Sequence, residues 1–386
     1  MVADLSLGLA APPRPARRGW LRDLERPGEV FGHLTPNWFA SVMGTGIVAA
    51  AASSLPVHIP GLRSFALAVW ALAAGLLVVL VAATAMHWLR YPATARSHIA
   101  HPVAGHFYGA PPMAVLTVGA GALLVGRDVL GLRLAVDLDW ALWFVGTVAG
   151  LGSTAVVPYL MFVRHRIPRT APFGGWLMPV VPPMVSAATG ALLVPHAPAG
   201  ARLALLGSCY AMFGLSLLAS AVVIPLIWRR GSSGDVCAPA MVPTLWIVLG
   251  PLGQSIAAVN LLGAAAVGVV STQAAHGLHV FGIAYGLAVL TVALVWASRA
   301  VRITARTARS GLPFSLTWWS FTFPVGTVVV GMSALAVQTG AAAFQAGAVV
   351  GYAALVTAWL VVSVRTLRAA ASGWIFRPPA PRAAAS

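Results

Sequence analysis

Hydroxyl and amide side chains recur within five apolar segments of this sequence, and these segments also carry proline and glycine. The polar residues are Ser41, Thr45, Thr117, Ser186, Thr189, Gln254, Ser255, Asn260, Thr322 and Thr327. Hydroxyls, amides and backbone groups freed by proline can solvate an anion weakly, without trapping it. Taken singly, each hydroxyl is better explained as a hydrogen bond that packs one helix against another. We therefore interpret the set as a whole as the lining of a pathway for small anions.

Aromatic residues are concentrated just before the last of these prolines. Phe323 directly precedes Pro324 in the segment 317 to 326, TWWSFTFPVG. A ring at a bend in a helix could swing into a narrow lumen and close it as a hydrophobic constriction. We expect Phe323 to act in this way, with ordinary packing against a neighbouring helix as the alternative. Trp318 and Trp319 are expected to be anchors at the membrane interface.

Other kinds of chemistry find little support in the residue pattern. No Asp, Glu or Arg falls in the middle of an apolar segment, whereas an intramembrane enzyme needs a nucleophile and a base, or a metal with carboxylates, at membrane depth. The histidines at 98, 101 and 106 share one connecting segment that contains no cysteine or carboxylate. For the histidines at 276 and 279, the sequence identifies no further metal ligands. We therefore predict no enzyme activity, no metal site and no cofactor.

The elements that must position the polar residues are membrane-spanning helices. The chain is 59% hydrophobic and 8% charged, and its mean hydropathy is +0.87, far from the composition of a soluble domain. A helix needs about 20 apolar residues to cross the hydrocarbon. Ten such spans are predicted, at residues 36–56, 64–88, 109–126, 138–162, 175–195, 203–227, 242–264, 276–298, 315–337 and 344–364.

Prolines mark a five-fold internal repeat in these spans. Pro36, Pro111, Pro182, Pro251 and Pro324 are separated by 75, 71, 69 and 73 residues, which is one helical hairpin per period. Interior proline removes a helical hydrogen bond and bends the helix. We therefore expect kinks at Pro111, Pro182, Pro251 and Pro324 in inner, odd-numbered helices, and straight outer helices against lipid. The predicted fold is an all-α polytopic membrane protein, with ten helices as five hairpins in a pseudo-five-fold ring around a central pore. The alternative is that these prolines only help the helices to pack and line no pore.

Positive charge predicts the orientation of this fold. All 24 basic residues are arginines, and 20 of them lie in the two tails and in the loops after even-numbered spans. By the positive-inside rule this side is cytoplasmic. We expect a multi-pass protein of the inner or plasma membrane with both termini in the cytoplasm. Residues 1–33 would form a basic, proline-rich tail, 34–368 the transmembrane domain, and 369–386 a second tail. Topology explains the net charge of +16, so no nucleic-acid partner is predicted.

Residues 35–47, TPNWFASVMGTGI, resemble the first helix of the tellurite-resistance/dicarboxylate transporter family. This family includes slow anion channels, malate permeases and sulfite efflux pumps. His101, Pro102 and the segment 317 to 326 are similar to the family at the matching places. The resemblance covers about residues 35–368. It implies ten helices around a pseudo-five-fold pore, assembly as a homotrimer, and a phenylalanine on the ninth helix that occludes the lumen. Phe323 matches that phenylalanine, and a shift in register would exchange it for Phe321.

Two functions from the transport class remain open. The first is a channel or facilitator for an anion of the malate, sulfite, chloride or nitrate class, which the uncharged spans favour. The second is a proton-linked carrier or exporter of a C4-dicarboxylate or sulfite, because the anion can carry its own proton and because His87, His276 and His279 lie near span ends where they could titrate. The resemblance gives the class of substrate rather than one anion.

Overall fold

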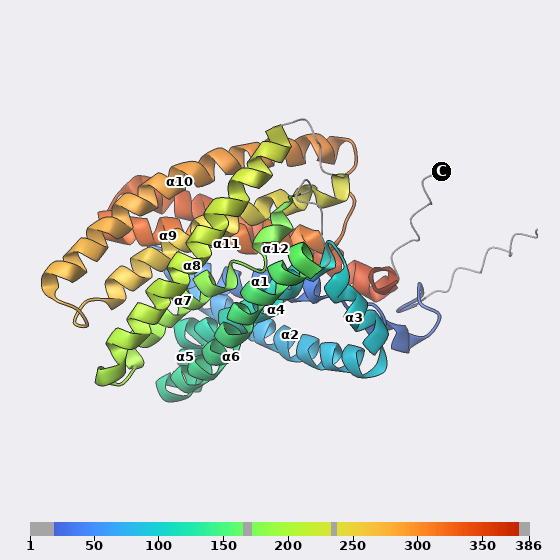
Figure 1. Cartoon of the computed structure of the whole chain (residues 1–386), viewed down its shortest axis with the longest axis horizontal. Helices are drawn as coiled ribbons and strands as arrows, with labels where there is room; N and C mark the ends of the chain where they lie inside the picture. The colour runs from blue at the N-terminus through green and yellow to red at the C-terminus, as the bar shows by residue number, and fades with distance from the viewer. Residues whose placement is uncertain (1–18, 165–171, 233–237, 378–386) are drawn as a thin grey trace, which may run out of the picture.

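The computed structural model describes residues 19–164, 172–232 and 238–377, and this part of the chain is helical without strands (Figure 1). Five pairs of helices follow one another along it: α1 (Phe39–Ser54) and α2 (Leu62–Arg90), α4 (Ala110–Gly121) and α6 (Leu132–Pro158), α7 (Pro182–Leu193) and α8 (Ala199–Ser232), α9 (Leu249–Ala265) and α10 (Thr272–Arg309), α11 (Phe323–Thr339) and α12 (Ala342–Ser372). The predicted all-α polytopic membrane class is confirmed.

Within the described ranges, eight helical segments are long and apolar enough to cross a membrane. Helices α1 and α7 do not reach that length, since they have 16 and 12 residues. Both are apolar and occupy the first position of their hairpins, like α4, α9 and α11. The eight segments together with these two shorter helices correspond in order to the ten predicted spans.

The two helices of each hairpin differ in burial. The spanning segments that contain α4, α9 and α11 are 61–78% buried, whereas those of α2, α6, α8, α10 and α12 are only 28–33% buried. In α1, 12 of 16 residues are buried, and in α7 11 of 12 are buried. The first helix of each hairpin is therefore an inner helix and the second is an outer helix. Outer helices expose apolar side chains such as Val78 (69%) and Leu218 (72%), which suits contact with lipid.

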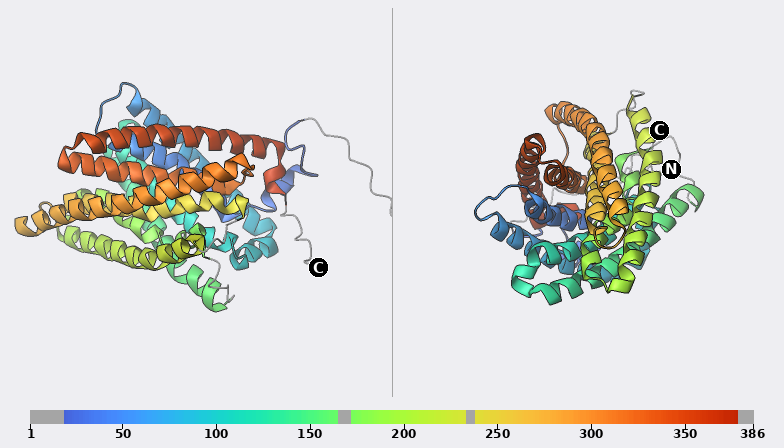
Figure 2. Two further views of the ribbon diagram at one scale, coloured as in Figure 1. Left: turned by 90° about the horizontal axis from the view of Figure 1, so that it is seen from above. Right: turned by 90° about the vertical axis from the view of Figure 1, so that its left-hand side faces the viewer.

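The inner helices form a closed ring. Helix α1 contacts α4, α4 contacts α7, α7 contacts α9, α9 contacts α11, and α11 contacts α1 again. Each outer helix packs against its own inner partner and against the inner helix of the next hairpin. In the end-on view the hairpins follow one another around the molecule in chain order (Figure 2, right). Because each hairpin reverses the chain, all five inner helices run in the same direction.

Each inner helix is entered through a 3-10 segment, at Pro36–Trp38, Ala104–Gly109, Gly174–Leu177, Pro239–Val248 and Leu316–Phe321. Pro182 is the first residue of α7, Pro111 and Pro324 are the second residues of α4 and α11, and Pro251 is the third of α9. Proline in a first helical turn removes no hydrogen bond that the α-helix would make. The expectation of kinks inside the α-helices is therefore corrected. The four prolines lie at the start of the α-helices, where the chain changes from 3-10 to α geometry.

Shorter elements complete the hairpins. They are η1 (Pro27–Phe31), α3 (Pro92–Ala100), the π-helical turns Ala122–Gly126 and Tyr159–Arg164, α5 (Arg127–Leu130), η7 (Val194–His196) and η10 (Trp374–Phe376). Helix α3 follows α2 directly and lies at the end of the molecule where the inner helices begin (Figure 1).

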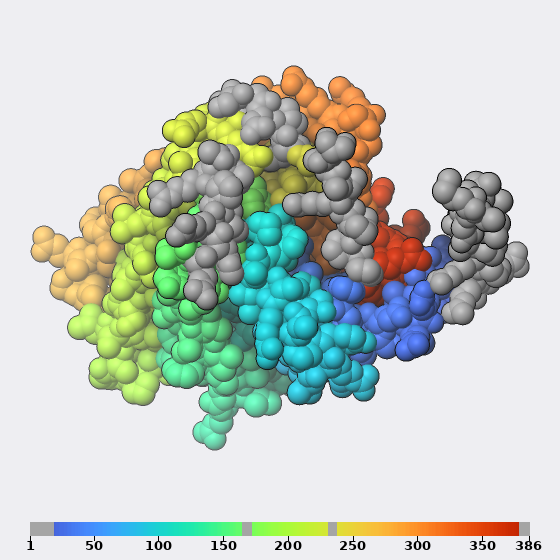
Figure 3. Space-filling view, turned by 45° about the vertical axis from the view of Figure 1, so that its right-hand side comes forward, coloured from blue at the N-terminus to red at the C-terminus, as the bar shows by residue number. Residues whose placement is uncertain are grey.

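The described parts of the two terminal segments pack against each other. The backbone N–H of Leu21 donates to the carbonyl of Ala371 at 2.7 Å. The rings of Trp38 and Phe376 are stacked with their centroids 5.2 Å apart. In the space-filling view the N-terminal and C-terminal segments lie side by side on one face (Figure 3). Residues 1–18 and 378–386, which belong to the predicted tails, lie outside the described residues.

Candidate anion pathway

One cavity lies where the five inner helices begin, and every hairpin contributes to its wall. It is lined by Ala40, Met43, Phe107, Met113, Met178, Val181, Ile247, Gly250, Pro251, Trp319, Ser320, Phe323 and Pro324. The cavity volume is about 30 Å³, and a single water requires roughly 10–15 Å³. The space therefore holds no more than a few waters, which is less room than an anion with its hydration shell needs.

Phe323 is part of the wall of this cavity. It is the first residue of α11 and is 6% exposed. Met43, Met113 and Met178, which come from three other hairpins, line the same space. Thioether and phenyl side chains provide an apolar surface that favours dewetting over conduction. The methionines carry no periodic signal in the sequence, and this contribution was not predicted.

Phe321 lies away from the cavity wall, two residues before Phe323. Its ring packs edge-on against Trp246, with centroids 5.4 Å apart, and against Trp318 at 5.7 Å. Trp318 and Trp319 are 9% and 3% exposed. The indole N–H of Trp319 donates to Thr366 Oγ1 on α12 at 3.1 Å. The expectation that these tryptophans are interfacial anchors is therefore wrong, because both belong to the interior.

The ten polar residues predicted to line the pathway are all buried, and none of them lines this cavity. Seven hydroxyls donate to carbonyls of the preceding turn: Ser41 to Trp38, Thr45 to Ser41, Thr117 to Met113, Thr189 to Val185, Ser255 to Leu252, Thr322 to Trp319 and Thr327 to Pro324, at 2.7–2.9 Å. Asn260 donates to Ile256 within its own helix at 2.8 Å. Eight of the ten polar side chains therefore already donate to carbonyls one turn earlier in the chain.

Ser186 and Gln254 differ from the other members of that set. Ser186 is fully buried, and its hydroxyl has no hydrogen-bond partner among the described residues. Gln254 is 7% exposed on α9. Thr327 lies at a contact between α9 and α11. A Cβ atom at Gly253 of α9 would lie 2.7 Å from Thr327 Oγ1, so Gly253 has no room for one. Gly253 thus permits the close approach of α9 to α11.

Asp139 is an acidic residue inside a span, and it bears on the expectation that no acidic residue falls in the middle of one. It is the eighth residue of α6 and is fully buried. The predicted fourth span began at residue 138, which placed Asp139 at the edge of the membrane. The described span extends over Leu132–Val163, so the carboxyl group lies about 10 Å along the helix from its first residue. The adjacent Asp137 is exposed, and composition alone does not distinguish the two.

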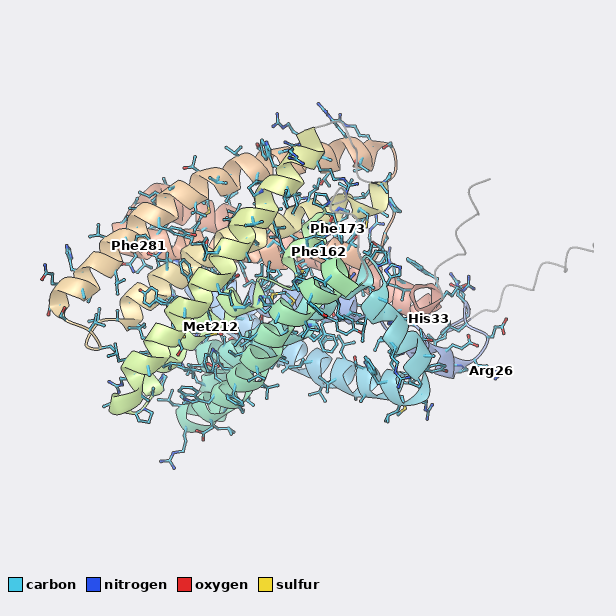
Figure 4. All side chains as sticks on the ribbon, in the orientation of Figure 1. Arg26, His33, Phe162, Phe173, Met212 and Phe281 are labelled. Atoms are coloured by element: carbon cyan, nitrogen blue, oxygen red, sulfur yellow. The ribbon has the colours of Figure 1, made fainter. Side chains whose placement is uncertain are left out.

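Histidines gather at the end of the molecule where the inner helices begin, which is also where His33 lies (Figure 4). The Nδ1 atom of His87 is 2.6 Å from the carbonyl oxygen of Phe31, and its ring stacks on that of His98 with centroids 5.3 Å apart. Burial is the main cause that lowers the pKa of His98 to about 4, and the nearby histidines at 87, 33 and 101 contribute to the same shift. His98 is thus neutral near pH 7. Within the described ranges, no three metal-ligating side chains are placed to hold a metal ion.

The closed ring of inner helices, the lipid-facing outer helices and the shared axial cavity define a polytopic membrane transport protein. Residues 33–367 match the family model described as SLAC1, voltage-dependent anion channel. The chain therefore belongs to the voltage-dependent anion channel family, whose members move anions. This finding confirms the family that residues 35–47 and 317–326 predicted.

Relatives with similar sequences carry names of transporters. The chain is 26% identical over 298 residues to a sulfite efflux pump of Trichophyton rubrum, covering 75% of this chain and 78% of that protein. It is 23% identical over 354 residues to a sulfite efflux pump of Arthroderma otae, covering 89% and 92%. An uncharacterised transporter of Methanocaldococcus jannaschii is 24% identical over 304 residues, covering 78% and 83%.

Proposed function

We propose that this protein moves small anions along the axis of the inner ring, and that Phe323 closes the pathway in the described state. The observation that carries the proposal is the cavity at the start of the inner helices, because all five hairpins contribute to its wall and Phe323 is among the lining residues. An axial space shared by five parallel helices is where a pathway through such a ring has to run. Catalysis is not part of the proposal.

The electrostatics of the ring favour anions over cations. The five inner helices run in one direction, so the positive ends of their dipoles, about half a charge each, converge near the cavity. Most arginines of the chain also belong to the tails and loops on that side. A field of this sign raises the local concentration of anions at the mouth.

The ten polar residues remain candidates for the lining of an open pathway. In that role their side chains would have to exchange bonds to helix carbonyls for contacts to the anion. Ser186 needs no such exchange, since its hydroxyl has no partner among the described residues. We therefore expect Ser186→Ala to lower anion flux more than Thr117→Val, whose hydroxyl is bonded to the Met113 carbonyl at 2.7 Å.

For the orientation we propose that the arginine-rich end, with both termini, faces the cytoplasm of a cell with this protein in its inner or plasma membrane. The positive-inside rule supports this orientation. A reporter fused after Ser386 tests it. Activity characteristic of the cytoplasm is expected, and a periplasmic signal would contradict the orientation.

The substrate is proposed to be an anion of the malate, sulfite, chloride or nitrate class. A second candidate function is proton-linked export of sulfite or a C4-dicarboxylate, which the names of the sulfite efflux pumps among the relatives favour. The two functions differ in energetics. A channel conducts without a pH gradient, whereas a proton-linked carrier requires one for net transport against an anion gradient.

Reconstitution into liposomes tests both functions. Flux of chloride, nitrate, sulfite and malate is recorded with and without a pH gradient. Flux that is independent of the gradient identifies a channel or facilitator. Flux of sulfite or malate that appears only with the gradient identifies the carrier, and no flux of any of the four anions contradicts the proposal.

We further propose that the protein assembles as a homotrimer through its outer helices. The broad apolar surface of these helices supports this assembly, although lipid alone could also cover it. Mass measurement of the protein in nanodiscs tests the assembly, and a single-copy mass would rule it out.

A further inference from the structure

Asp139 is a buried acid without a hydrogen-bond partner in the part of the chain that the structure describes. Its side chain on α6 is 0% exposed. Neither carboxyl oxygen has a hydrogen-bond partner among the described residues. It is also the one fully buried Asp or Glu in the described part of the chain. A carboxyl group in this position within a membrane helix is costly to bury, and ionisable residues at such positions commonly mark functional sites.

The carboxyl group is packed against an inner helix. A Cβ atom built on Gly119 of α4 would lie only 2.9 Å from Asp139 Oδ1 and 3.0 Å from Leu142 Cβ. Glycine at position 119 therefore provides the space that the carboxyl group occupies. The same helix carries Met113, which lines the axial cavity. Helix α4 thus connects the buried acid to the wall of the pathway.

Among the described residues, the elements packed around Asp139 provide no compensating charge. Helix α6 packs against α4, α7 and the π-helical turn Ala122–Gly126, and none of these elements contains a titratable residue. Tyr159 belongs to the π-helical turn that follows α6, at the opposite end of the helix from Asp139. Arg127 and Asp128 on α5, and Arg133 and Asp137 on α6 itself, are exposed. His106 and Tyr108 belong to the 3-10 segment before α4 and pack near the opposite end of α6. An unpaired carboxylate in such a setting is strongly disfavoured, and the neutral acid is the form that the packing accommodates.

We propose that Asp139 is a proton-binding site in the closed protein, and that it releases its proton when α4 moves away from α6. The bond broken is the carboxylic O–H, and the proton passes to water that reaches the separated helices. Because the closed state holds the proton more tightly, protons favour closure by linkage. Anion flux should therefore rise with pH. The dependence of flux on pH rests on the proposed anion transport, whereas the protonation of Asp139 does not.

Two variants separate the proton site from a general charge effect. Asp139→Asn replaces the acid by a neutral group of the same shape. Asp137→Asn removes an exposed charge two residues away and serves as the matched control. Flux through proteoliposomes is measured with the pH varied equally on both sides.

Wild type and Asp137→Asn should show flux that rises with pH, by up to about tenfold per pH unit, the limit for one proton. Asp139→Asn should show low flux that does not change with pH. The proposal is overturned if wild-type flux is independent of pH or falls with it, if Asp139→Asn keeps the rise, or if Asp137→Asn loses it.

Infrared spectroscopy at neutral pH provides a readout that does not depend on transport or on the Asn variant. A carbonyl band of a protonated carboxylic acid is expected in wild type and in Asp137→Asn, and it should be lost in folded Asp139→Asn. Absence of the band in wild type overturns the proton site even if flux depends on pH. Presence of the band with no anion flux would mean that the proposed function fails while the proton site stands.

Discussion

The indole N–H of Trp359 donates a hydrogen bond to Thr45 Oγ1 across 3.2 Å. Trp359 belongs to α12 and Thr45 to α1, so this bond joins the last hairpin to the first. Both residues are buried. Because the Thr45 hydroxyl also donates to Ser41 of its own helix at 2.7 Å, it uses both of its roles, as donor and acceptor. The ring of helices is thus closed by a specific polar contact as well as by packing.

Loss of this contact should weaken the closure of the ring. Trp359→Phe is expected to destabilise the protein by about 0.5–1.5 kcal/mol, the range for one hydrogen bond. Thr45→Val should cost a similar amount, and the double variant should cost less than the sum. Melting of the detergent-solubilised protein measures these effects. Additive losses would show that the two side chains are not coupled, and Thr357→Val, an exposed site on α12, serves as the control.

Removal of the Phe323 phenyl group from the cavity wall should open the pathway. Phe323→Ala removes an aromatic side chain that lines a cavity of about 30 Å³, and we expect the flux of small anions into liposomes to increase. Phe321→Ala is the matched control, since Phe321 packs on Trp246 and Trp318. It should leave flux at the wild-type level. Equal flux in wild type and Phe323→Ala would assign Phe323 to packing, and an increase in the Phe321 variant alone would make Phe321 the gate.

Close approach of inner helices should make Gly253 intolerant of a side chain. A Cβ at this position would meet Thr327 and the backbone nitrogen of Val328 on α11, and overpacking of this kind typically costs about 1–3 kcal/mol. Gly253→Ala should therefore lower the melting temperature. Gly75→Ala on the outer helix α2 meets open space and should leave the melting temperature unchanged or raise it. The same response from both variants would contradict the tight contact between α9 and α11.

The histidine cluster predicts a loss of stability in acid. An unfolded chain binds a proton at His98 as the pH falls below about 6.5, whereas burial keeps folded His98 neutral until about pH 4. Because the unfolded state binds more protons in this window, the stability contributed by His98 is present above about pH 6.5 and is lost as the pH falls towards 4. His98→Gln should show a smaller fall in melting temperature between pH 7 and pH 4.5.

The exposed His196 provides the control for this measurement. His196→Gln should retain the full wild-type decline in melting temperature. If His98→Gln and wild type decline to the same extent, the acid sensitivity arises from other groups.

Much of the fold could be predicted because the repeat of prolines from Pro36 to Pro324 and the apolar runs are properties of the chain itself. The number of hairpins, the inner and outer roles and the place of Phe323 near the start of an inner helix all follow from that repeat. The helix type before each proline could not be predicted in this way. A proline at the start of α4 and a proline inside a longer helix give the same apolar pattern, and only the packing of neighbouring hairpins decides between them.

The polar residues show a second limit of the sequence. The sequence is compatible with Thr45 and Thr327 as pathway lining and as helix contacts, since a hydroxyl can donate to a carbonyl three or four residues earlier in either case. Asp137 and Asp139 are separated by two positions, yet one is exposed and the other is fully buried. The rotation of α6 against α4 determines this difference. At the start of a span, polar and apolar residues occur on both faces of the helix. The hydrophobic periodicity there does not show which of the two aspartates is buried.

The closed ring also constrains how the protein can be made. Helix α1 leaves the ribosome first, yet its contacts to α11 and α12 cannot form until the last hairpin has been synthesised. Until then one flank of α1, with its small residues and the Thr45 hydroxyl, faces lipid or the insertion machinery. Each newly inserted hairpin can dock on the one before it, so assembly proceeds around the circle in order of synthesis. The final step is a post-translational meeting of the oldest and the youngest hairpins, and a nascent chain that lacks the last hairpin should remain open and vulnerable to membrane proteases.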